Sequence, residues 1–155
     1  MSLCPCCSGL AYDHCCQPYH QRQQYAPTPE ALMRSRFSAY AIGLVDYIVE
    51  TYAPKLNAAQ FRNDIADGTQ LQWRLLEVIS SDAKENSGTV NFVAWFMDEQ
   101  GQLACLAEHS RFIKEGGQWY YLDGEQRHPD TVYRQRGRNT PCPCLSGKKF
   151  KQCCA

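Results

Sequence analysis

Residues 89–98 read Thr-Val-Asn-Phe-Val-Ala-Trp-Phe-Met-Asp, an apolar run whose large side chains alternate between two faces. The even-numbered side chains from 90 to 96 would lie on one face, and Val93, Trp95 and Met97 would lie on the other. Short runs rich in β-branched and aromatic residues are typical of strands. Because both faces are apolar, the sheet that contains this strand needs cover on both sides.

Three further runs of this kind lie before and after it. They occupy residues 71–79, 103–114 and 118–123. Short clusters of turn-forming residues separate the four runs, at residues 84–88, 98–101 and 115–117. Since short turns join antiparallel strands, we expect a four-stranded antiparallel meander.

The part of the chain before residue 69 has helical periodicity instead. Thr28 is suited to be an N-cap and Pro29 to be the first helical residue. Apolar residues then recur at helical spacing from Met33 to Leu44, and Gly43 is a natural break. A helix is therefore expected from residue 29 to about residue 43.

Two shorter helices are expected next, at residues 46–52 and 57–68. In the second of these, Gln60 would complete a capping box, and Phe61 and Ile65 would be buried. Helices followed by a meander predict an α+β fold in which the helices cover one sheet face. The other face would then be covered by a terminal module, by a second copy of the chain in a dimer, or by a ligand.

The composition is that of a globular protein: 155 residues, of which 44% are hydrophobic. No apolar run is long enough to cross a membrane, and the N-terminus lacks the pattern of a signal peptide. We therefore expect a cytoplasmic protein. The net charge of zero hides an asymmetry, because residues 29–133 hold 9 basic and 15 acidic residues whereas residues 134–155 hold six basic and no acidic ones.

Nine of the ten cysteines lie in two short segments at the ends of the chain. Residues 4–16 read CPCCSGLAYDHCC and residues 142–154 read CPCLSGKKFKQCC. Without gaps, both fit the pattern C-P-C-x-S-G-x-x-[YF]-x-x-C-C. The repeat places four cysteines in identical register, whereas the tenth, Cys105, lies in a predicted strand and reads as a core thiol.

Four thiolates at such spacing are typical of a closed structural zinc site. We therefore predict two zinc ions per chain, one in each segment. The predicted ligands are Cys4, Cys6, Cys15, Cys16, Cys142, Cys144, Cys153 and Cys154. Disulfides are the alternative, but bonds between neighbouring cysteines would be strained and a reducing compartment would open them.

Three other residues could enter the first site. Cys7 leaves open which sulfurs bind the metal there, and His14 or His20 could replace a cysteine. Four thiols already complete a tetrahedral site, so we expect neither histidine to be needed.

The C-terminal segment, from Gly137 to Cys154, resembles the SEC-C motif of the SecA translocation ATPase. That motif carries Gly where this chain has Cys7 and Leu145, and its last ligand is commonly His rather than Cys16 or Cys154. These departures keep the number of ligands. By this resemblance, the motif binds zinc and mediates contacts with proteins and lipids.

The whole chain resembles the YchJ-like family of bacterial proteins, on PEALMRSRFSAY at 29–40, EHSRF at 108–112 and QWYYLDG at 118–124 between two SEC-C motifs. The resemblance implies the cone-shaped nuclear transport factor 2-like (cystatin-like) fold for the middle domain, without an activity. The expected domains are residues 1–22, 28–133 and 134–155.

The cone-shaped fold would enclose a pocket. The candidate lining residues are Arg34, Arg36, Trp95, Glu108 and Tyr121. Glu108 could act there as a general base. The more economical interpretation is that Glu108 pairs with Arg34 or Arg36 and ties helix to sheet. Asp123, before Gly124, reads as a turn residue.

Two functional hypotheses follow. The first is a docking protein whose basic C-terminal module binds a partner protein, RNA or the ribosome, or anionic lipid. The residues expected to contact the partner are Arg134, Arg136, Arg138, Lys148, Lys149 and Lys151. The second is a small-molecule-binding protein or enzyme that uses the pocket, which rests on likeness of fold alone. We favour docking over catalysis.

Overall fold

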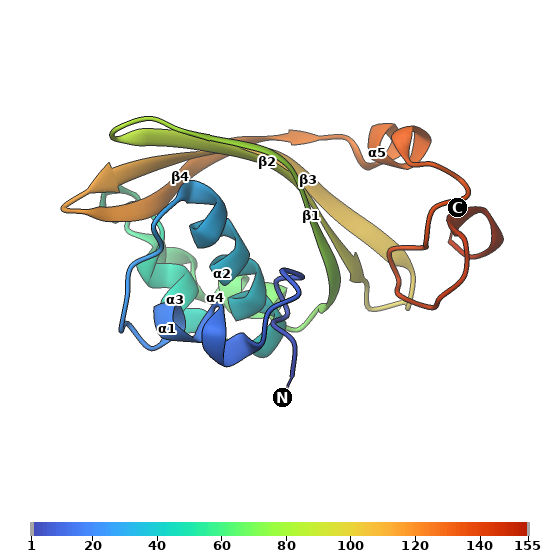
Figure 1. Cartoon of the computed structure of the whole chain (residues 1–155), viewed down its shortest axis with the longest axis horizontal. Helices are drawn as coiled ribbons and strands as arrows, with labels where there is room; N and C mark the ends of the chain where they lie inside the picture. Colours follow the sequence, from blue (N-terminus) through green and yellow to red (C-terminus); the bar gives the residue numbers. More distant parts are fainter. Residues whose placement is uncertain (1, 155) are drawn as a thin grey trace.

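The computed structural model describes residues 2–154 and contains the predicted meander. The sheet has the order β1-β2-β3-β4, with every neighbouring pair antiparallel. The strands are β1 (Gln72–Ala83), β2 (Ser87–Met97), β3 (Leu103–Glu115) and β4 (Gln118–Arg127). Each strand extends beyond one end of its predicted run, because the residues there still pair with the neighbouring strand. The sheet curves around one group of helices (Figure 1).

The longest helix, α2, runs from Pro29 to Ile42 and begins and ends as predicted. The Thr28 side chain accepts a hydrogen bond of 3.0 Å from the backbone N–H of Ala31. Gly43 ends the helix with a positive φ of 84°, which a residue without Cβ adopts at little cost. This helix packs against the concave face of the sheet (Figure 1).

The remaining N-terminal helices are short: α1 (Gln17–His20), α3 (Val45–Glu50) and α4 (Arg62–Gly68). Single 3-10 turns occupy Pro54–Leu56 and Ala58–Phe61. The capping-box prediction is wrong, because Asn57 is left-handed and Gln60 donates to the carbonyl oxygen of Leu56. Ile65 is buried as expected, but Phe61 remains 49% exposed.

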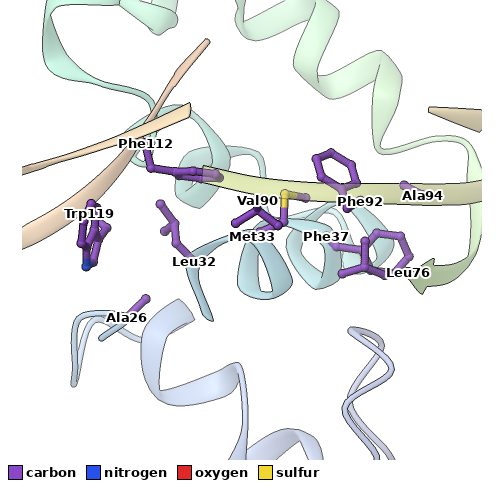
Figure 2. Packing of buried hydrophobic residues seen from close by; sticks show 10 residues of the cluster. All are labelled: Ala26, Leu32, Met33, Phe37, Leu76, Val90, Phe92, Ala94, Phe112 and Trp119. Atoms are coloured by element: carbon purple, nitrogen blue, oxygen red, sulfur yellow. The ribbon is translucent and has the colours of Figure 1, made fainter. Parts of the chain in front are cut away.

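The main core lies between α2 and the concave sheet face (Figure 2). Phe37 of α2 faces Leu76, Phe92 and Ala94, and the other end of the core closes around Trp119. The residues after α3 connect the helices to the sheet beside this core. Thr51 and Ala53 exchange backbone hydrogen bonds with Tyr121 of β4. The helices thus close the cone on one side.

A helix that the sequence analysis missed, α5 (Pro129–Gln135), covers part of the convex face. Val132 and Tyr133 of α5 pack against Val93, Trp95 and Cys105. Figure 1 shows α5 and the C-terminal module beyond the opposite side of the sheet from α2. Three covers were possible for this face: a terminal module, a second copy of the chain or a ligand. The structure supplies the C-terminal module together with α5, which precedes it.

Within residues 2–154, the structure contains no helix with the length and apolar character needed to cross a membrane.

Candidate metal centres

Each terminal segment brings four cysteine sulfurs together. The Sγ atoms of Cys4, Cys6, Cys15 and Cys16 lie within 4.8 Å of one another, and so do those of Cys142, Cys144, Cys153 and Cys154. These are the two sets predicted from the sequence. All ten cysteines are free thiols, so the segments are not joined by disulfides.

The two segments fold alike. In each, the first cysteine N–H donates to a carbonyl six residues on, Cys4 to Leu10 and Cys142 to Lys148, both at 2.8 Å. A 3-10 turn then precedes the last two cysteines, at Tyr12–His14 and Phe150–Gln152. The repeated sequence therefore encodes a repeated loop.

One non-glycine position in each loop has a left-handed backbone. Cys7 has φ of 69° and Leu145 has φ of 67°. This explains why the SEC-C motif carries glycine there, since other residues are strained in that conformation. The exposed Cys7 sulfur lies 3.5 Å from the carbonyl oxygen of Pro5 and is outside the four-sulfur cluster.

The spacing of the sulfurs fits a tetrahedral metal site. Zinc–sulfur bonds of about 2.3 Å place tetrahedral sulfurs about 3.8 Å apart. The Cys6–Cys15 and Cys15–Cys16 sulfurs are 3.6 and 3.9 Å apart, and the Cys144–Cys153 and Cys153–Cys154 sulfurs are 3.5 and 3.6 Å apart. The donor set and its dimensions therefore suit a thiophilic ion.

Neighbouring thiols in each cluster shift one another's pKa in opposite directions. Hydrogen bonds from Cys16 and Cys4 lower the pKa of Cys6, whereas hydrogen bonds with Cys4 and Cys6 raise the pKa of Cys16. Burial and hydrogen bonds with its neighbours likewise raise the pKa of Cys154. Four crowded sulfurs cannot all ionise without a positive charge between them.

The neighbouring histidines stay outside the sulfur cluster. His20 is buried, and its Nε2–H donates to the carbonyl oxygen of Ser35 at 2.7 Å. Its Nδ1 therefore accepts from the Tyr12 hydroxyl at 2.6 Å. Burial lowers the pKa of His20, so the ring is a neutral link between the module and α2. His14 is exposed.

The C-terminal module is attached to the convex face through aromatic rings and one arginine. Phe150 stacks on Tyr133 of α5, with ring centroids 6.0 Å apart and planes at 11°. Arg136 donates to both carboxylate oxygens of Glu77, at 2.8 and 3.0 Å, and lies over Trp95. Arg136, which was predicted to contact a partner, thus pairs with Glu77, and it also borders the hollow of the C-terminal module.

The other predicted partner-binding residues are exposed: Arg134, Arg138, Lys148, Lys149 and Lys151. Arg134, Arg138 and Lys151 line a hollow of about 470 Å³, which Tyr133 and Phe150 also border. This surface is concave and cationic.

A second hollow, of about 340 Å³, lies inside the cone. Of the five residues predicted to line it, Arg36, Glu108 and Tyr121 do so. Arg34 instead holds the N-terminal module, and Trp95 lies on the convex face because its position has the opposite parity to Ala94.

Two expectations about carboxylates are wrong. Among residues 2–154, no ion pair joins Glu108 to either arginine. Glu108 accepts hydrogen bonds from Ser110 and Tyr121. Asp123 is in strand β4, where it pairs with Arg111 of β3.

Residues that were not predicted from the sequence also shape the two hollows. Tyr133 belongs to a helix whose start, with His128 as N-cap and Pro129 at the first position, was recognisable. Tyr52 and Trp73 line the inner hollow, but no local motif reveals a residue that meets its neighbours only in the folded chain.

Known proteins share this architecture. Residues 28–124 match the family described as "YchJ, middle NTF2-like domain", and residues 138–155 match the SEC-C motif. A UPF0225 protein of Vibrio parahaemolyticus is 47% identical, with 99% of this chain and 98% of that protein covered. One from Enterobacter sp. is 48% identical, with 98% and 97% covered.

Two solved structures are also similar. A SEC-C motif containing protein from Rhodopseudomonas palustris has a TM-score of 0.76 at 39% identity, over 81% of this chain and 98% of that one. A SEC-C motif containing protein from Psychrobacter arcticus has a TM-score of 0.68 at 31% identity, over 97% of this chain and 94% of that one.

Proposed function

The chain belongs to the UPF0225 family, and from that premise and its two four-thiol clusters we propose that it is a zinc-binding docking protein. Among abundant ions, zinc prefers four thiolates in a closed tetrahedral site. Each cluster would hold one ion. Zinc would neutralise part of the thiolate charge and hold a loop too short to fold alone.

The proposed docking surface is the basic hollow of the C-terminal module. The main support for the proposal is that basic side chains gather around a concave surface there. Arg134, Arg138 and Lys151 surround it, and residues 134–155 contain no acidic side chain to neutralise them. A four-thiolate zinc site carries a charge of −2, which leaves the module cationic when the six basic residues are counted.

We propose an acidic segment of another protein as the partner. A concave site of this size, bordered by Tyr133 and Phe150, suits side chains that combine carboxylates with apolar contacts. RNA, including ribosomal RNA, is the second candidate, because its phosphates would gain from the same cations. Anionic lipid is the third candidate. Ten cysteines without a disulfide suit a reducing compartment, so we propose that this activity is cytoplasmic.

A binding assay with matched charge variants tests the proposal. Zinc-loaded protein is titrated with a fluorescent peptide containing alternating glutamate and phenylalanine, with single-stranded RNA and with phosphatidylglycerol vesicles. The test variant is Arg138→Gln/Lys151→Gln, and the control is Lys55→Gln/Lys84→Gln, which removes two exposed charges elsewhere.

We expect salt-sensitive binding of the peptide that weakens at least tenfold in the test variant and is unchanged in the control. Cys153→Ser/Cys154→Ser should also lose the peptide. Tighter binding of RNA or vesicles than of the peptide would show that the partner is not an acidic protein segment. Equal losses of affinity in the test and control charge variants would show that the hollow is not the binding surface.

A further inference from the structure

The hollow inside the cone contains two charged side chains that are almost wholly buried. Arg36 is 4% exposed and Glu108 is 6% exposed, and both line the hollow. Burying an ion is costly unless a partner compensates it. Among the ion pairs of residues 2–154, none joins these two side chains, so the protein holds the two groups apart at this site.

Each charged group has atoms that the protein leaves without a partner. Arg36 Nη1 donates to the carbonyl oxygen of Ile48 and to Thr51 Oγ1, but Nε and Nη2 donate no hydrogen bond within residues 2–154. Glu108 Oε1 accepts from Ser110 and Tyr121, whereas Oε2 accepts none. These free atoms are not sealed inside the protein. They are open to the hollow.

Both charges lie beside Tyr121, so they form one polar end of the hollow. The Arg36 guanidinium carbon is 5.0 Å from the centre of the Tyr121 ring, and the Tyr121 hydroxyl donates to Glu108 at 2.5 Å. Arg36 also lies over the ring of Tyr52, at 4.4 Å. The guanidinium is therefore fixed in place by contacts that leave two of its nitrogens free.

The other end of the hollow is aromatic. Trp73 packs against Phe37, with ring centroids 5.8 Å apart, and against Tyr40 at 5.7 Å. Trp73 Nε1 donates to the carbonyl oxygen of Gly68, which fixes the indole. Phe92, which pairs with Glu108 across β2 and β3, and Leu106 line the wall between the two ends. A volume of about 340 Å³ is within the range of small-molecule sites.

From these observations we propose that the hollow binds a small aromatic amino acid or a close analogue, with carboxylate and ammonium at one end and a ring at the other. The carboxylate would meet the free nitrogens of Arg36, whose planar fork matches it. The ammonium would donate to Glu108 Oε2, and the ring would lie against Trp73. The two ligand charges would balance the two buried protein charges.

The matched probes are L-phenylalanine, 3-phenylpropanoate, which lacks the amine, and phenethylamine, which lacks the carboxylate. Each is titrated into zinc-loaded full-length protein and followed by NMR chemical shifts and calorimetry. We expect saturable binding of L-phenylalanine, at least tenfold weaker binding of either analogue, and shifts centred on the residues of the hollow.

Two variants, Glu108→Gln and Ala94→Leu, test the location of the site, and Glu125→Gln is the control. Glu108→Gln keeps the size of the side chain but removes its charge, and Glu125→Gln makes the same change at an exposed position of β4. Ala94→Leu narrows the hollow and leaves Arg36 and Glu108 unchanged. It provides an independent test if Glu108→Gln does not fold. Loss of binding in Glu108→Gln or Ala94→Leu, with Glu125→Gln unchanged, would support the proposal. Absence of saturable binding by L-phenylalanine, or binding of either analogue as tightly as L-phenylalanine, would overturn it.

Discussion

Arg34 donates a hydrogen bond of 2.9 Å from Nη1 to the carbonyl oxygen of Cys6. A side chain of the longest helix thus holds the middle of the first cysteine loop, and Glu30 holds the same guanidinium through Nε. The N-terminal module is therefore fastened to α2, whereas the C-terminal module is fastened to the opposite face of the sheet through Phe150 and Arg136.

Because of this bond, we expect metal retention in the first module to depend on α2. In a Cys153→Ser/Cys154→Ser background, which leaves only the first site, Arg34→Met should release zinc to a chromogenic chelator faster than the parent. A lost charged hydrogen bond costs about 1.5–3 kcal/mol. Arg22→Met, which removes an exposed pair with Glu50, is the control and should leave the rate unchanged. Equal rates for Arg34→Met and its parent would contradict the role of this bond.

Phe150 should be the main apolar anchor of the second module. Its ring is 1% exposed, and truncating such a ring to alanine costs about 3–5 kcal/mol. We expect Phe150→Ala to lose the metal of the second module while the middle domain keeps its thermal unfolding transition. Zinc analysis and circular dichroism measure the two outcomes, with Lys149→Ala as an exposed control. Full retention of metal in Phe150→Ala would show that the stacking on Tyr133 is dispensable.

The left-handed backbone at Leu145 predicts a gain of stability. Leu145→Gly relieves a strain of about 1–2 kcal/mol and loses little packing, because the side chain is 60% exposed. Zinc affinity of the second module, measured by competition with a chelator, should rise severalfold. Leu145→Ala keeps the Cβ and should show no such gain. If alanine binds zinc as tightly as glycine does, backbone strain is not the cause.

Gly124 is required because Glu108 lies against it. A Cβ at position 124 would lie 2.3 Å from Glu108 Oε1, closer than any real contact. Gly124→Ala should destabilise the protein by about 1–3 kcal/mol in urea unfolding. In a Glu108→Ala background, Gly124→Ala should cost less stability than it does in the parent protein. Strictly additive effects of the two changes would show that they do not interact.

The terminal modules could be predicted in detail because their information is local. Four cysteines in identical register specify the sulfur clusters, and the repeat itself excludes accidental spacing. The meander and α2 were predictable for the same reason, since alternation and the Thr28–Pro29 start act within a few residues. Even the glycine preference at Leu145 became interpretable once its φ was known.

The inner hollow could be predicted only in part, because its geometry depends on contacts between distant segments. The sequence placed Glu108 on the concave face, but it could not show that Arg36 turns toward Ile48 and Thr51 instead of toward the carboxylate. Trp95 was assigned to the hollow although its strand parity places it on the convex face. Arg136 was read as a free surface charge because its partner, Glu77, lies far away in sequence.

The metal content of native protein tests the central claim most directly. Protein purified under reducing conditions without added metal is analysed for its elements, alongside Cys15→Ser/Cys16→Ser and Cys153→Ser/Cys154→Ser. We predict two zinc ions per chain in the parent and one in each variant, with the middle domain still folded. A parent that contains no metal, or a variant that keeps as much zinc as the parent, would contradict the assignment of a zinc ion to each end of the chain.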